Sequence, residues 1–158
     1  MNAGRILATM AFLAGAASLS AQTATQSVTF QVDAINQISV AGSPSLVINT
    51  ATAGSNPTQA SAAATWAVTT NQSTAKITAS INSAMPAGLT LQVNMSAPAG
   101  GTSAGAQTLT ATAVDVVTGI TKLAQSGIAI GYTLDATPTA GVITSTSRTV
   151  TYTITGGT

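Results

Sequence analysis

Histidine, cysteine and glutamate are absent from this chain of 158 residues, and charged residues make up only 4% of it. A soluble domain ordinarily has about 25% charged residues. The seven charges belong to Arg5, Asp33, Lys76, Asp115, Lys122, Asp135 and Arg148. Without cysteine there can be neither a disulfide nor a thiolate metal site, and without histidine there is no side chain that ordinarily titrates near neutral pH.

These absences remove most chemical functions. General acid–base catalysis needs a group whose pKa can be brought near neutrality, and the only carboxyl side chains, Asp33, Asp115 and Asp135, are far apart in the sequence. Calcium needs several oxygen ligands close together, and no such cluster is visible. No basic stripe offers a footprint for nucleic acid. We therefore expect no enzyme, no cofactor and no metal.

The amino terminus is typical of a secretory signal peptide, which we assign to residues 1–21. Arg5 supplies the positive charge, and an apolar stretch of about a dozen residues follows it. A membrane-spanning helix needs roughly 20 apolar residues, so this stretch is too short to serve as an anchor. Cleavage after Ser20 or after Ala21 fits the small residues there.

The remaining residues, 22–158, are expected to form one exported domain, located outside the cell or on its surface. No later apolar run reaches membrane-spanning length, and no cysteine follows the leader to carry a lipid. Loss of Arg5 leaves three bases against three acids. A net charge near zero gives little repulsion between copies and favours association.

Alternation of apolar and polar residues dominates this domain and predicts half-buried β-strands. Threonine fills most of the polar positions; it favours extended backbone and leaves a hydroxyl for water. The alternating runs lie at residues 28–40, 46–48, 65–69, 76–81, 89–95, 108–117, 128–134 and 149–154. The first run is interpreted as one long strand or two with a kink.

The segments between the runs contain turn-forming residues. Short turns at residues 71–73 and 86–88 predict hairpins, and residues 50–62, 97–106 and 135–141 predict longer loops. The alternation changes parity between residues 109 and 116, which indicates a bulge or a bend. Residues 114–123 are the one place where a short helical turn competes with a strand.

Seven to nine short strands with regular turn signals predict an all-β fold, an immunoglobulin-like antiparallel β-sandwich. The competing architecture is an outer-membrane barrel, which would need girdles of aromatic residues at its lipid-facing band. The whole chain has five aromatic residues, so the sandwich is favoured.

Trp66 has two possible roles. In a secreted adhesin or carbohydrate-binding module, which is our alternative function, its ring would stack against a sugar. A lone tryptophan in an alternating strand is more often part of the core, and we favour that interpretation.

The segment that follows the leader also has two interpretations. A polar lead, residues 22–27, runs into Val28, Phe30 and Val32, which alternate with Thr29 and Gln31. Residues 27–33 either fold back as the first strand of their own domain or pair with a neighbouring copy, joining subunits through main-chain hydrogen bonds.

Taken with the leader and the threonine-rich strands, the segments SVTFQVDA and TVTYTIT resemble those of bacterial fimbrial and spore-coat-type secreted β-sandwich subunits. The resemblance implies a structural subunit of a surface filament, pilus or coat, with copies of itself as partners. It implies that Val28, Phe30 and Val32 are donor-strand side chains. Many such subunits carry a disulfide, which this chain cannot form.

Overall fold

The computed structural model describes residues 20–157. The predicted leader, residues 1–21, therefore lies almost wholly outside the described residues. The chain divides into two units, residues 1–32 and 33–158, which are described separately. In the first unit, residues 20–32 contain no strand; every strand of the described residues belongs to the second unit.

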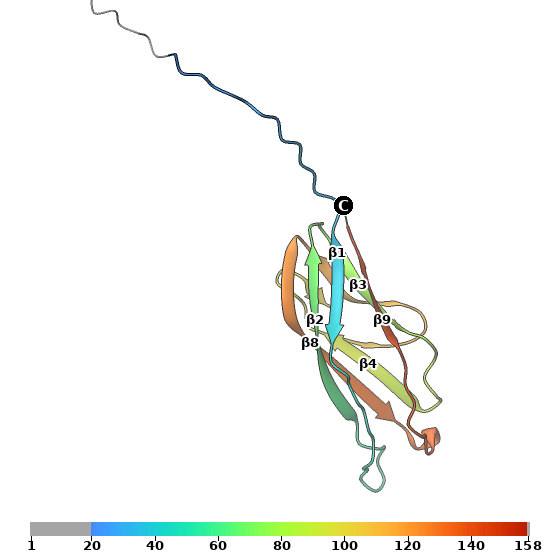
Figure 1. Cartoon of the computed structure of the whole chain (residues 1–158). Coiled ribbons are helices and arrows are strands. Elements are labelled where there is room, and N and C mark those ends of the chain that lie inside the picture. The colour runs from blue at the N-terminus through green and yellow to red at the C-terminus, as the bar shows by residue number, and fades with distance from the viewer. Residues whose placement is uncertain (1–19, 158) are drawn as a thin grey trace, which may run out of the picture. The chain divides into compact units, whose positions relative to one another are not determined.

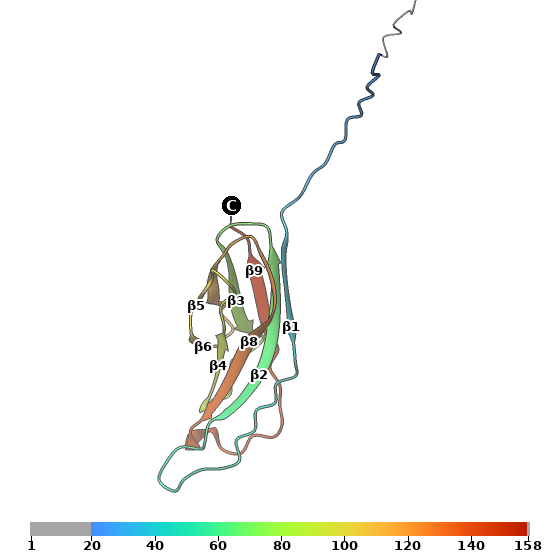
Figure 2. The same cartoon turned by 90° about the vertical axis from the view of Figure 1, so that its left-hand side faces the viewer.

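The second unit is a sandwich of two antiparallel sheets (Figures 1 and 2). The five-stranded sheet has the order β1-β2-β8-β4-β6, and the four-stranded sheet has the order β5-β7-β3-β9. The strands are β1 (Asn36–Ala41), β2 (Ala60–Thr70), β3 (Ala75–Ile81), β4 (Leu89–Met95), β5 (Thr102–Ser103), β6 (Ala106–Thr108), β7 (Val114–Ile120), β8 (Leu123–Ala136) and β9 (Val150–Thr155). The nine strands confirm the predicted fold class.

The core lies between the sheets and is built by the inward positions of the alternating runs. In β3, Ala75, Ile77 and Ala79 are fully buried, whereas Lys76 faces solvent. Facing side chains from the other sheet, including Val93 and Ile130, complete the packing. Burial of the larger side chains among these, such as Ile77, Val93 and Ile130, contributes about 1.5–3 kcal/mol each, which explains how the fold forms with so few charges.

The two turns that were expected to close hairpins instead carry the chain from one sheet to the other. Residues 71–74 join β2 to β3, and residues 82–88 join β3 to β4, and in each case the two strands belong to different sheets. The hairpin prediction was therefore wrong. A short turn that closes a hairpin and a short turn that crosses between two sheets contain the same kinds of residues. Only the packing of the flanking strands decides whether those strands pair side by side or face each other.

The parity change predicted between residues 109 and 116 lies where the chain crosses again between the sheets, from β6 to β7. β6 lies in the five-stranded sheet and β7 in the four-stranded one, and buried Leu109 begins the connection. Within β7 the pairing with β3 shifts register, and the consecutive side chains Val116 and Val117 are both buried. A bulge permits this. Residues 114–120 are strand, so the helical alternative was wrong.

The first alternating run forms a shorter strand than expected. Only β1, at Asn36–Ala41, is assigned as strand, and residues 28–35 are not. Residues 46–48 are likewise not a strand, although Leu46 packs against the core. Among residues 20–157, no helix is long and apolar enough to cross a membrane.

Candidate functional site

One lateral side of the sandwich, bounded by β1 and β9, is open. β1 is the outermost strand of the five-stranded sheet and pairs only with β2, and β9 is the outermost strand of the other sheet and pairs only with β3. The two strands are neighbours across this side (Figure 1). No third strand of the described residues lies between them, so each presents one edge of unpaired main-chain groups.

The apolar residues that face inward along this open side are incompletely covered. On β9, Val150, Tyr152 and Ile154 are only partly buried, whereas their neighbours on β3 are fully buried. On β1, the inward residue Val40 is 52% exposed even though its cross-strand partner is the buried Trp66. The open side therefore has an apolar lining to which a further strand could add its own side chains.

The opposite lateral side is bounded by the short edge strands β5 and β6. Leu109, which follows β6, is 2% exposed, and its backbone N–H donates to the Leu91 carbonyl at 2.9 Å. Next to it, the Ser103 hydroxyl donates to the Met95 carbonyl at 2.6 Å, so that β5 is bonded to the end of β4. The side between β1 and β9 thus offers the longer edges, since these strands have six residues each, whereas β5 has two and β6 has three.

A cluster of polar side chains joins β1 to the end of β2 and to the turn that follows it, at one end of the open side. The Asn36 amide Nδ2 donates to Gln72 Oε1 at 2.7 Å, and the Thr70 hydroxyl donates to Asn36 Oδ1 at 2.7 Å. Gly156, directly after β9, lies so close that a side chain there would overlap the Gln72 carboxamide. Gly156 and these side chains therefore lie close together, and the open side is narrowed at this end.

The segment predicted to donate a strand is extended and exposed. Val28, Phe30 and Val32 are 75%, 88% and 77% exposed, and none of them belongs to a strand. These are large apolar side chains, and each would bury substantial area if covered. The alternative in which residues 27–33 form the first strand of their own sheet does not match this arrangement, in which the first strand begins at Asn36.

Two tyrosines bridge the sheets beside the open side. The hydroxyls of Tyr132 on β8 and Tyr152 on β9 lie 2.7 Å apart and share a hydrogen bond. Burial raises the pKa of both phenols, that of Tyr152 most strongly, so both stay uncharged at neutral pH. The pair fixes the distance between the sheets where β9 lacks an outer neighbour. The sequence gives no signal that these two residues meet.

The remaining candidate groups are not assembled into a reactive site. Trp66 is 2% exposed and belongs to the core, as favoured, and its ring is not accessible for stacking against a sugar. The Asp115 carboxylate pairs with Lys76 Nζ at 3.0 Å, and Asp135 accepts from the Gln59 amide at 2.8 Å on the other sheet. Within residues 20–157, no three acidic side chains come together as metal ligands would.

Comparison with known proteins supplies no relative: no family model, no curated protein and no solved structure matches this chain.

Proposed function

We propose that this protein is a secreted structural subunit of a surface filament, pilus or coat, and that copies assemble by β-strand pairing. The observation that carries the proposal is the coexistence of an open, apolar-lined side between β1 and β9 with an exposed, alternating apolar segment at residues 28–32. The first is a site with room for a further strand, and the second is an apolar segment that lies outside both sheets.

The chemistry of the donor segment matches that of the acceptor. In an extended strand, alternate side chains lie on one face and are about 6.6 Å apart, so Val28, Phe30 and Val32 would all point into the sandwich of a neighbouring copy. Their polar neighbours Thr29 and Gln31 would face solvent, as Thr151 and Thr153 do on β9. Main-chain hydrogen bonds to the free edge of β9 would supply the pairing.

Charge does not oppose this association. The described residues carry three bases and three acids, so copies would approach one another without net repulsion. The leader assigned to residues 1–21 would deliver the subunit outside the cell, where the strand exchange takes place. A sandwich that obtains its last strand from a neighbour forms a head-to-tail contact, and such contacts generate open filaments when they do not close into rings.

The first experiment uses a matched pair of variants on opposite faces of the donor segment. Phe30→Asp places a charge on the face that would enter the neighbouring sandwich, and Thr29→Asp places the same charge on the outer face. We expect fibres or large oligomers from the unmodified chain and from Thr29→Asp, by electron microscopy and light scattering. Phe30→Asp should remain monomeric and folded.

A second experiment separates the donor from the acceptor. The Phe30→Asp monomer keeps an intact open side, so a synthetic peptide of residues 22–33 should bind it and perturb the NMR signals of β1 and β9. The same peptide with Phe30→Asp should not bind. An unmodified chain that stays monomeric at high concentration, with residues 28–32 paired in its own sheet, would refute the proposal.

A further inference from the structure

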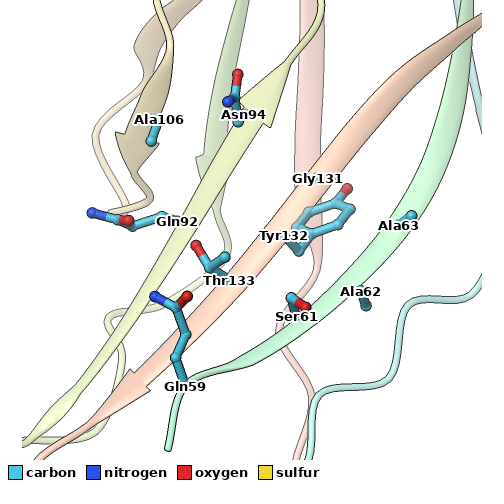
Figure 3. A pocket seen from close by; sticks show the side chains of 10 residues that line it. All are labelled: Gln59, Ser61, Ala62, Ala63, Gln92, Asn94, Ala106, Gly131, Tyr132 and Thr133. Atoms are coloured by element: carbon cyan, nitrogen blue, oxygen red, sulfur yellow. The ribbon is translucent and has the colours of Figure 1, made fainter.

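A polar hollow lies on the outer face of the five-stranded sheet, away from the open side. It is shallow and largely open to solvent, with a volume of about 660 Å³, and it crosses four strands, β2, β8, β4 and β6 (Figure 3). Pairing aligns its residues in rows: Ser61, Thr133 and Gln92 lie side by side on three neighbouring strands. Four strands at about 4.8 Å spacing give the hollow a length of about 14 Å across the sheet.

The hollow exists because three of the four residues in one row across the sheet are alanine or glycine. Gly131 on β8 lies between Ala63 on β2 and Asn94 on β4, and Ala106 on β6 follows. A Cβ built at Gly131 would meet only the Asn94 carbonyl, at 3.9 Å. Glycine is therefore not needed here for packing or for a left-handed backbone, and what it provides is free space above the sheet.

The side chains around this space are uncharged hydrogen-bonding groups. Carboxamides and hydroxyls combine donors and acceptors in one small area. The Gln59 amide is oriented by Asp135, to which its Nε2 donates at 2.8 Å, so that its oxygen remains available as an acceptor. The polar side chains that line the hollow are those of Gln59, Ser61, Gln92, Asn94 and Thr133.

The lining favours an uncharged ligand. It contains no lysine or arginine to hold an anion, and a single carboxylate at its margin is too little for a cation. Tyr132, the one aromatic residue of the lining, is only 7% exposed, so the hollow lacks the exposed aromatic or aliphatic anchors of a protein interface. A neutral ligand with many hydroxyls fits these groups. We infer that the hollow is a binding site for a neutral carbohydrate.

This site is separate from the strand-pairing site and does not depend on assembly. Repetition along a filament would raise the avidity of an individually weak site, because many copies would engage one glycan-coated surface together. The inference also differs from a sugar site at Trp66, because that ring is buried in the core.

The test fills the hollow without disturbing the fold. Gly131→Val introduces a β-branched residue that suits a strand and meets no atom closer than 3.9 Å from its Cβ. Ala129→Val is the matched control, since Ala129 is exposed on the same face of β8 but does not line the hollow. Gln92→Ala removes one hydrogen-bonding group instead of the space.

The probes are neutral oligosaccharides, free of carboxylate, sulfate and amino groups, first on an array and then in solution. The unmodified chain and Ala129→Val should bind the same glycans and show NMR shifts at Asn94 and Gly131. Gly131→Val and Gln92→Ala should bind at least tenfold more weakly while melting at an unchanged temperature. Absence of any neutral glycan bound at millimolar concentration, or equal binding by Gly131→Val, would overturn the inference.

Discussion

At the scale of single residues, Tyr132 and Tyr152 show how two polar groups can be buried in a mostly apolar interior by hydrogen-bonding to each other. Each phenol supplies the hydrogen-bond partner that the other would otherwise lose on leaving water. The Trp66 indole differs, because its Nε1 has no hydrogen-bond partner within the described part of the chain. Its large apolar ring is buried all the same, since the area removed from water outweighs one unpaired N–H.

The tyrosine pair predicts a loss of stability in alkali. Burial raises the pKa of both phenols above the ordinary value of 10.0, so above that pH the unfolded chain loses protons that the folded chain keeps. The free energy of unfolding then falls as pH rises, by at most about 1.4 kcal/mol per tyrosine per pH unit. Below pH 10 the pair causes no such change.

Urea denaturation of the monomeric Phe30→Asp variant at several pH values between 8 and 11 would measure this effect. The same protein carrying Tyr132→Phe and Tyr152→Phe is the control and should lose distinctly less stability over the same range. If the two proteins show the same pH dependence, the tyrosines are not the groups responsible.

At the scale of elements, the connections between strands determine how the strands are placed relative to one another. The loop into β4 depends on Gly88, whose φ of +79° is a left-handed conformation that favours glycine. A Cβ at this position would lie 2.5 Å from the backbone nitrogen of Ala140. The Gly88 carbonyl also accepts from the Thr137 N–H at 2.9 Å, so this loop is bonded to the end of β8.

Gly88→Ala should therefore destabilise the domain by at least about 2 kcal/mol, through backbone strain and steric overlap together. Gly54→Ala is the matched control: its φ is +83°, but a Cβ there would meet nothing within 4 Å. We expect the control to cost about 1 kcal/mol, from strain alone. Chemical denaturation of both variants would compare them, and equal losses would show that the overlap is relieved by movement of the loop.

At the scale of the whole molecule, stability comes from apolar burial and β-pairing, with very little from charge. The ion pair of Lys76 and Asp115 is the one salt bridge found among residues 20–157, and both side chains are nearly half exposed. Exposed pairs of this kind contribute about 0–1 kcal/mol.

The free energy of unfolding should accordingly be almost independent of salt. We expect a change of less than about 1 kcal/mol between low salt and molar sodium chloride, and a similarly small loss in Lys76→Ala. Denaturation curves of the monomeric variant in the two buffers would check this. A strong loss of stability on adding salt would contradict the view that electrostatics contribute little.

The alternation of the sequence by itself determined the fold class, the positions of most strands and the burial of Trp66. It did so because inward and outward positions of a half-buried strand differ in composition at every step. The most regular runs, those in β3, β4 and β9, were accordingly predicted within a residue or two, whereas the longer strands β2 and β8 extend well beyond the runs that predicted them.

Only the tertiary structure decided which strands pair. Because the candidate sites are formed by paired strands and by their free edges, it also decided where those sites lie. Alternation specifies the two faces of a strand but not its neighbours, so neither the crossing turns at residues 71–74 and 82–88 nor the open edges of β1 and β9 could be recognised in advance. The hollow at Gly131 depends on four strands being in register, which no single segment encodes. Pairing is set by long-range packing, and packing exists only in the folded chain.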